Sequence, residues 1–375
     1  MKKTVLQLIF IFLLTTLTYS QTNVYDSISY GGRWRTYMTH LPTGYNVSKK
    51  YPLILAFHGG SPLGYQSIQY QSRLSEKSDS AGFIVVYPEG VKIAGNRTWN
   101  AGGCCAPATT LNIEDVGLVN SLLNTLNKTR SIDSTRVYAT GFSNGALLGY
   151  KLANQLTRRF AAIAIVEGDF VSYPWQPSRP IPIISFHSYQ DQNVKYNGGV
   201  TTGTTGTYFP PQDSMFSIIS SNYSCSLKKE TVFHDASKYD HFKYSNCSGN
   251  VVIEQYVSYD GEHSWPGGQS LSGVAVSTQF SATYLMWKFF QNYSINLNTD
   301  IEVISDKPDL TNYAFTFSNR INPDNLSSEG NYNLLNSLGQ VIWSGKNIKE
   351  KDFTYLTKGL YFLKSEKMMQ KLLKQ

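Results

Sequence analysis

The chain is short of cysteine, of long basic runs and of long apolar runs, and each shortage excludes a class of protein. Only four of its 375 residues are cysteines, and their spacing fits none of the usual zinc patterns, so we expect no metal. Lysines and arginines are scattered, with runs no longer than pairs, which argues against a nucleic-acid partner. Beyond the first twenty residues, no segment is apolar enough to form a stable membrane span.

What the chain does contain is typical of a globular protein with a sizeable core. Apolar residues make up 41% of it and aromatic residues 14%. The formal net charge is +7, a modest excess that favours solubility rather than a particular partner. The length allows one large α/β domain and one small domain.

Residues 1–20 have the pattern of a secretory signal peptide. Lys2 and Lys3 form a charged start, residues 5–17 are mostly apolar, and small residues precede a cut after Ser20. An uncleaved membrane anchor is the alternative, but the apolar stretch is short and lacks a stop-transfer flank. We therefore predict a protein that is secreted or held at the cell surface.

Export permits disulfides among Cys104, Cys105, Cys225 and Cys247. Cys225 and Cys247 bracket a polar, hairpin-like segment, and we expect them to pair. Cys104 and Cys105 are adjacent, so they either form a vicinal disulfide or stay reduced and buried.

Apolar runs alternate with helical patterns from residue 24 to residue 293. Two alternating polar–apolar runs that meet at Gly31-Gly32 predict an opening hairpin. Continuous apolar runs predict strands buried on both faces. The expected strands are 52–57, 83–87, 137–139, 161–166, 181–186 and 251–256, and the expected helices are 115–126, 146–153 and 279–290. This alternation predicts an α/β fold with a doubly wound, mostly parallel sheet.

The character of the chain changes after residue 293. Residues 294–312 are mostly polar and predict a linker. Residues 313–375 contain short β-rich runs at 313–317, 332–335, 340–343 and 360–363. At this length the segment predicts a small β-sandwich domain at most.

The segment Gly141-Phe142-Ser143-Asn144-Gly145 follows an expected strand and precedes an expected helix. Strand, Gly-x-Ser-x-Gly and helix are the layout of a nucleophile elbow, which makes Ser143 the candidate nucleophile. The alternative is a small-residue turn without chemistry. In an elbow, the backbone N–H of Asn144 helps to bind an oxyanion, and Gly60 and Ser61 are the candidates for the second donor.

A serine nucleophile needs a base to take its proton and an acid to orient that base. In α/β-hydrolases the chain order is serine, acid, histidine. His263, in a loop shortly after the 251–256 strand, is the candidate base, and Asp191, a few residues after the 181–186 strand, is the candidate acid. The remaining histidines are His40, His58, His187, His234 and His241, and the rival acids are Asp169, Asp240, Asp260 and Glu262. His58 is expected to pack beneath the Gly60 loop.

Six motifs occur in a fixed order. They are His58-Gly59-Gly60, Tyr87-Pro88-Glu89-Gly90, Trp99-Asn100-Ala101-Gly102-Gly103-Cys104-Cys105, Asp115-Val116-Gly117, Gly141-Phe142-Ser143-Asn144-Gly145-Ala146 and His263-Ser264-Trp265-Pro266-Gly267. Together they resemble the secreted polyhydroxybutyrate depolymerase/feruloyl esterase family of α/β-hydrolases, which includes acetyl xylan esterases. The resemblance covers residues 25–293 and implies the triad Ser143, Asp191 and His263, without metal or organic cofactor.

Within that resemblance, Trp99 and Trp265 are candidates for the substrate cleft, with core packing as the alternative. Asp115 and the Cys104-Cys105 pair are expected to be structural. There is one departure from the family pattern: Ser188-Tyr189 stand where the family commonly has Gly-Thr before the acid. Their added bulk is expected to reshape the acyl pocket.

The tail, residues 313–375, contains Gly359-Leu360-Tyr361-Phe362-Leu363-Lys364 and the terminal Lys371-Leu372-Leu373-Lys374. These segments resemble the C-terminal sorting domain of the Bacteroidetes type IX secretion system, although the usual Tyr-Pro-Asn-Pro opening is missing. The resemblance implies that the type IX secretion machinery is a partner. A small carbohydrate-binding domain is the alternative.

The sequence therefore predicts an exported serine esterase with a signal peptide at 1–20, an α/β-hydrolase domain at 24–293, a linker at 294–312 and a sorting domain at 313–375. The expected substrate is a feruloyl or acetyl ester of plant polysaccharide. The alternatives are a polyhydroxyalkanoate depolymerase, a secreted serine peptidase of the same fold and a non-catalytic glycan-binding protein.

Overall fold

The computed structural model describes the greater part of the chain, which separates into two compact units, 1–300 and 301–375. The described residues are 22–170, 174–201, 206–271, 273–295, 315–317, 320–321, 330–336, 341–357, 359–365 and 369–374. The predicted signal peptide and most of the predicted linker lie outside them. Within the described ranges, no helix is both long and apolar enough to cross a membrane.

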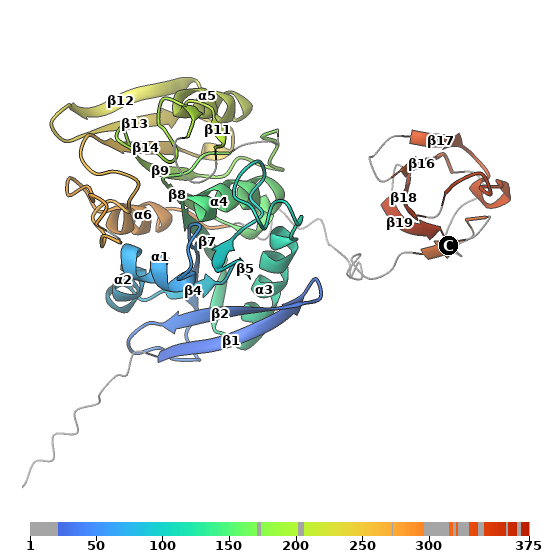
Figure 1. Ribbon diagram of the computed structural model, residues 1–375, viewed down its shortest axis with the longest axis horizontal. Coiled ribbons are helices and arrows are strands. Elements are labelled where there is room, and N and C mark those ends of the chain that lie inside the picture. Colours follow the sequence, from blue (N-terminus) through green and yellow to red (C-terminus); the bar gives the residue numbers. More distant parts are fainter. Residues whose placement is uncertain are drawn as a thin grey trace, which may run out of the picture. The chain divides into compact units, whose positions relative to one another are not determined.

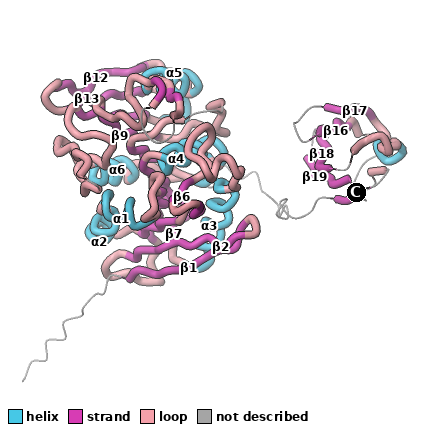
Figure 2. Tube along the Cα trace, viewed as in Figure 1, coloured by secondary structure: helices cyan, strands magenta, loops and turns pink. Residues whose placement is uncertain are grey.

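The first unit is built on one sheet of ten strands, in the order β1-β2-β4-β3-β7-β8-β9-β14-β13-β12 (Figures 1 and 2). The six neighbours from β4 to β14 run parallel, and two antiparallel strands extend the sheet at each end. The strands are β1 (Thr22–Tyr30), β2 (Arg33–Leu41), β3 (Tyr51–Phe57), β4 (Ile84–Pro88), β7 (Ile132–Phe142), β8 (Ala162–Val166), β9 (Ile183–Ser188), β12 (Leu227–Asp235), β13 (Tyr239–Ser245) and β14 (Ile253–Ser258).

Within the described residues of this unit, six helices and two short strand pairs accompany the sheet. The two pairs are antiparallel and lie outside the main sheet. These elements are α1 (Tyr65–Ser72), α2 (Leu74–Ala81), α3 (Asp115–Thr129), α4 (Asn144–Gln155), α5 (Gln212–Asn222), α6 (Ala282–Phe290), β5 (Val91–Ile93), β6 (Asn96–Thr98), β10 (Gly199–Val200) and β11 (Tyr208–Phe209), with the 3-10 helices η1 (Thr157–Arg159) and η2 (Ser248–Asn250). Every strand and helix predicted between residues 24 and 293 is present, with ends that differ by a few residues.

The helices cover both faces of the sheet, as a doubly wound α/β-hydrolase fold requires. In Figure 1, α1, α2 and α6 lie on one side of the strands, and α3, α4 and α5 lie on the other. Each face has its own apolar core, and β3 contributes to both. Leu53 and Leu55 pack toward α3 and α4, whereas Ile54 and Ala56 pack toward α2 and α6. The alternation along β3 is the two-residue period of a strand buried on both faces.

The segment between Cys225 and Cys247 forms the hairpin β12–β13, and the disulfide between these cysteines lies at its base. The sequence predicted the hairpin-like segment, and the structure adds that β13 pairs with β14 and continues the central sheet. β12 is the last strand, is exposed along most of its length, and has register shifts between Leu227 and Glu230 and between Thr231 and Phe233.

The described part of the second unit forms one five-stranded sheet around a small apolar core, where the sequence suggested a β-sandwich. Its strand order is β15-β19-β18-β16-β17. The elements are β15 (Phe315–Phe317), β16 (Tyr332–Asn336), β17 (Val341–Gly345), η3 (Ile348–Glu350), β18 (Gly359–Lys364) and β19 (Met369–Lys374).

Candidate active site

Ser143 stands alone between the end of β7 and the start of α4, at a sharp turn. Its backbone has φ +54° and ψ −122°, and residues other than glycine rarely adopt such a positive φ. The Ser143 N–H donates to the carbonyl of Val166, 3.0 Å away on neighbouring β8. A strained, hydrogen-bonded serine at a strand-to-helix turn is the local geometry of a nucleophile elbow.

The glycines around Ser143 are required by close backbone approach. A Cβ on Gly141 would collide with the carbonyl oxygen of Gly145, and a Cβ on Gly145 would collide with the carbonyl oxygen of Phe57. A Cβ on Gly59 would lie 3.2 Å from the Cβ of Ser143. The elbow therefore packs directly against the loop that follows β3.

Asp191 and His263 meet behind this turn. They follow β9 and β14, which are parallel neighbours, so their loops leave the same edge of the sheet. His263 Nδ1 lies 2.7 Å from Asp191 Oδ2, and the other oxygen of Asp191 accepts the N–H groups of Asn193 and Val194. The Asp191 side chain is completely buried, whereas that of His263 is 13% exposed.

The charge state of Asp191 follows from these contacts. Burial alone would raise the pKa of its carboxyl, but the neighbouring His263, with help from His187, holds that pKa well below its usual value. Asp191 is therefore ionised, and it fixes the tautomer of His263 with the proton on Nδ1. The remaining ring nitrogen, Nε2, is the one left to exchange a proton with a substrate.

Ser143 and His263 line the same cavity, whose volume is about 520 Å³. Leu147, Val194 and Phe209 supply apolar side chains to it. Its polar lining comes from Gly60, Asn96, Thr98, Asn144, Asn193 and Thr201. A cavity of this size with apolar patches and a few polar groups is typical of a site for small organic groups.

Of the three predicted oxyanion donors, two line the cavity. Asn144 and Gly60 both line the cavity, and Asn144 is the first residue of α4, where N–H groups lack partners within the helix. Ser61 is a correction: its N–H donates to the carbonyl of Arg97 at 3.1 Å, in an isolated bridge to β6. That N–H is therefore already used.

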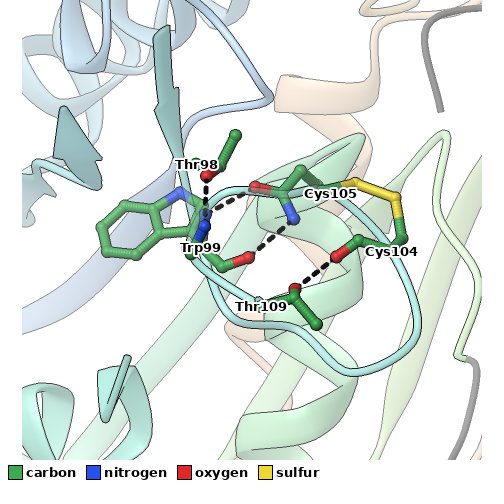
Figure 3. Close-up of a disulfide and its surroundings, with 7 residues drawn as sticks. Thr98, Trp99, Cys104, Cys105 and Thr109 are labelled. Carbon is green, nitrogen blue, oxygen red and sulfur yellow. Dashed lines mark hydrogen bonds between the residues drawn. A yellow bond between two sulfur atoms is a disulfide. The ribbon is translucent and has the colours of Figure 1, made fainter. Parts of the chain in front are cut away.

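The Asn144 side chain has a second contact that the sequence did not reveal. Its Oδ1 accepts the N–H of Trp99 at 2.7 Å, and its Nδ2 donates to the carbonyl of Trp99 at 3.1 Å. The segment after Trp99 leads to the Cys104–Cys105 disulfide, and both cysteines line the cavity (Figure 3). Thr109 Oγ1 also donates to the carbonyl of Cys104. The cavity wall is thus fastened to the residue next to Ser143.

Trp99 and Trp265 are corrections to the substrate-cleft prediction. Both side chains are fully buried, and neither lines the cavity. Trp99 Nε1 donates to the carbonyl of His58, and Trp265 Nε1 donates to Thr283 Oγ1, each at 2.9 Å. Their indoles fill the interior beneath the site and satisfy their single polar group there, as buried tryptophans usually do.

His58 packs beneath the Gly60 loop, as expected. Its Nε2 accepts the N–H of Gly90 at 2.9 Å, and its Nδ1 lies 2.6 Å from the carbonyl of Gly59. Burial lowers the pKa of His58 to about 4, so the ring is neutral and holds one proton in a fixed place. His58 thus connects the loop after β3 with the loop after β4, which is a structural role.

The rival acids form hydrogen bonds elsewhere. Asp169 accepts from the N–H of Phe170 and from Gln212, and Asp240 accepts from Tyr189 and Tyr259. Asp260 accepts from Ser277, Thr278 and Gln279, and Glu262 is exposed.

Ser188 and Tyr189, which depart from the family pattern, both form hydrogen bonds within the structure. Ser188 Oγ donates to the carbonyl of Gly261 at 2.8 Å and so joins the acid loop to the base loop. Tyr189 OH donates to Asp240 at 2.8 Å, beneath the β13 end of the sheet. Neither residue lines the cavity, so the expected reshaping of an acyl pocket by their bulk is not what the structure shows.

One buried acid beside the site was missed by the sequence interpretation. Glu167 follows β8 directly, and one ligand-type atom from each of Glu167, Asp191 and His263 lies within 4.8 Å of the others. Three such side chains could approach a metal ion, but the short contact between His263 Nδ1 and Asp191 Oδ2 already uses two of those atoms. The signal that could have revealed Glu167 is its place at the end of a fully apolar strand.

Comparisons with known proteins agree with this geometry. Residues 35–174 match the model of the Esterase PHB depolymerase family. Feruloyl esterase B of Piromyces equi is 26% identical over 249 residues, which cover 63% of this chain and 44% of that protein. Feruloyl esterase C of Emericella nidulans is 28% identical over 261 residues, which cover 68% of this chain and 83% of that protein.

Two further matches complete the comparison. A bifunctional acetylxylan esterase/xylanase of Neocallimastix patriciarum is 31% identical over 158 residues, which cover 42% of this chain and 22% of that protein. The solved acetyl xylan esterase from Aspergillus awamori has a TM-score of 0.46 and 13% identity, over 71% of this chain and 99% of that one. The chain spans less than half the length of the first two curated relatives that it matches. The sequence matches support the family predicted for the first unit.

Proposed function

We propose that this chain is a serine carboxylic-ester hydrolase of the esterase PHB depolymerase family. The observation on which the proposal chiefly rests is the convergence of Ser143 and His263 on one cavity, with buried Asp191 hydrogen-bonded to His263 from behind. The family match over residues 35–174 includes the elbow and supports the same activity.

The mechanism follows from the roles that this geometry allows. Ser143 Oγ attacks the ester carbonyl, and His263 Nε2 takes the serine proton and then gives it to the leaving alcohol. Asp191 orients His263 and stabilises the imidazolium form. The N–H groups of Asn144 and the Gly60 loop bind the oxyanion, and water then releases the acyl group from Ser143 by the reverse sequence.

For the substrate we propose feruloyl or acetyl esters of plant polysaccharide. Relatives named as feruloyl and acetylxylan esterases support this choice. The cavity supports it as well, because the disulfide together with Leu147, Val194 and Phe209 offers an apolar surface to an acyl group. Polyhydroxyalkanoate remains the second candidate, since the matching family model is named for polyhydroxybutyrate depolymerases.

The test is a substrate panel with wild-type protein and Ser143→Ala. Methyl ferulate, acetylated xylan, p-nitrophenyl acetate, polyhydroxybutyrate and a peptide amide are supplied in parallel. We expect hydrolysis of the esters and about a 10⁶-fold loss of kcat in Ser143→Ala with an unchanged melting temperature. Full activity of that variant, or cleavage of the peptide alone, would contradict the proposal.

For localisation we propose export by a signal peptide at 1–20 and passage of the outer membrane directed by residues 313–375. The sequence pattern of each segment supports this, and the small separate sheet of the second unit is compatible with a detachable sorting domain. In a host with type IX secretion, deletion of residues 313–375 is expected to leave the esterase inside the outer membrane. Secretion at the wild-type level would contradict a sorting role.

A further inference from the structure

Glu167 lies behind the candidate triad at a place where an acid could serve His263. It is the first residue after β8, and Asp191 is in the loop after β9, the adjacent parallel strand. The Glu167 side chain is completely buried. Because one carboxylate oxygen of Glu167 lies within 4.8 Å of both Asp191 and His263, a small rotation would bring it into hydrogen-bond range of the ring.

The two carboxyl oxygens of Glu167 differ in their contacts. Oε2 accepts the N–H of Ser188 at 3.3 Å and lies 3.4 Å from His187 Nε2. That ring nitrogen makes its stronger contact, 2.7 Å, with the carbonyl of Val194. Oε1 is buried and has no partner of ordinary hydrogen-bond geometry among the described residues. A buried carboxylate oxygen that faces no donor is costly, so this carboxyl is expected to carry a proton and to hydrogen-bond to Asp191.

The backbone of Glu167 is also held in an unfavourable conformation. Its φ is +50°, although it is not a glycine, and its N–H donates to the carbonyl of Phe186 at 2.9 Å. Such conformations persist where the surrounding structure imposes them, and they cluster at functional sites. Here the turn aims the carboxyl at Asp191 rather than at solvent.

The two acids differ in charge. Burial and the negative charge of Asp191 raise the pKa of Glu167 well above its usual value, whereas the pKa of Asp191 is depressed. The raised pKa favours the protonated form of Glu167, and the lowered pKa favours the ionised form of Asp191. A protonated carboxyl beside a carboxylate donates its hydrogen to it, so the pair holds one negative charge in total.

We infer that Glu167 is a positioning residue that hydrogen-bonds to Asp191 and takes over the orientation of His263 when the Asp191 carboxylate is removed. This inference rests on the proposed serine esterase function. Without Asp191, burial still raises the pKa of Glu167, but the contribution from the Asp191 charge is gone. The carboxyl then loses its proton to solvent more readily, and its carboxylate turns toward His263 Nδ1–H. Among the described residues, Asp191 is the acid hydrogen-bonded to His263, and Glu167 is the second acid of this cluster.

The experiment compares kcat and KM for p-nitrophenyl acetate in wild type, Asp191→Ala, Glu167→Gln and the double variant Asp191→Ala/Glu167→Gln. A triad that lacks any acid loses about 10⁴-fold in kcat, and we expect that loss in the double variant. Asp191→Ala alone is expected to lose only about 10²-fold, because the Glu167 carboxylate recovers part of the orientation. KM should change little across the series, since the acid does not contact the substrate.

Two controls separate positioning from packing. Asp191→Ala/Asp169→Asn removes another buried acid two residues from Glu167 and is expected to match Asp191→Ala. Asp191→Ala/Glu167→Asp keeps a carboxyl and is expected to be more active than the glutamine double variant. Melting temperatures identify any variant that fails to fold. If the Asp191→Ala variants do not fold, the same comparison is made between Asp191→Asn and Asp191→Asn/Glu167→Gln.

Equal kcat values for Asp191→Ala and Asp191→Ala/Glu167→Gln would overturn the inference and leave the esterase proposal intact. A wild-type protein that hydrolyses no ester would instead overturn the proposed function itself. The two failures are therefore distinguishable in one set of assays.

Discussion

The buried ion pair between Arg35 and Asp115 gives a stability prediction with a defined magnitude. Asp115 Oδ1 lies 2.8 Å from Arg35 Nη2, and the two side chains are 0% and 5% exposed. Asp115 Oδ2 accepts the N–H of Asn100 at 2.7 Å, and Arg35 also donates to the carbonyl of Glu89. The substitution Asp115→Ala leaves the buried Arg35 guanidinium without its counter-charge and the buried N–H of Asn100 without its acceptor.

Removal of one member of a buried pair costs about 3–5 kcal/mol, because the remaining charge is uncompensated. With an unfolding entropy of about 2.1 cal/mol/K per residue over roughly 270 residues, this corresponds to a fall in melting temperature of about 5–9 °C. Urea unfolding followed by circular dichroism gives the free energy, and a thermal scan gives the temperature. Activity should fall as well, because Asn100 lies at the start of the segment that leads to Cys104 and Cys105 in the cavity wall.

The matched control is Glu76→Ala, which removes an exposed pair with Arg73 on α2. Water and salt screen an exposed pair, so this variant should unfold close to the wild-type temperature. If Asp115→Ala were as mild as Glu76→Ala, the argument from burial would be refuted.

Three other outcomes are expected. Gly141→Ala should yield insoluble or inactive protein, because a Cβ there collides with the Gly145 carbonyl; soluble, active protein in an expression and esterase assay would contradict this. Glu167→Gln should gain stability relative to wild type as pH rises, because burial raises the folded pKa of Glu167. The stability that its protonated form contributes is fully present below the unfolded pKa, about 4.3, and is lost as pH rises toward the folded pKa. Urea unfolding at pH 5, 6 and 7 measures the difference, and a constant difference would show that Glu167 is ionised in the folded protein. EDTA should leave esterase activity unchanged; a loss restored by added divalent ion would mean that the acidic cluster binds a metal.

Features that depend on local chain geometry were predictable from the sequence. The elbow at Ser143 was visible because close backbone approach permits only glycine at positions 141 and 145. Chain order likewise selected Asp191 and His263, since parallel strands bring the loops at their carboxyl ends together. The roles of these residues in catalysis remain predictions for the assays above.

Features that depend on pairing between distant segments were not predictable. Ser61 looked like an oxyanion donor until its N–H was found bound to Arg97 in β6, and Glu167 became significant only beside Asp191. Trp99 and Trp265 illustrate the same point, because an indole next to a motif can face the cavity or the core. The helices α1, α2 and α5 were missed because their sequences are largely polar and have weak apolar stripes.

In the hairpin β12–β13, β12 is an irregular strand at the edge of the central sheet. β12 has two register shifts, and the first includes Lys228 and Lys229, the latter with φ +51°. Bulges and lysines disrupt the regular row of N–H and C=O groups that a strand from another molecule would need in order to pair. This end of the ten-stranded sheet is therefore a poor template for edge-to-edge aggregation, which is a useful property for a protein that we expect to work at high dilution outside the cell.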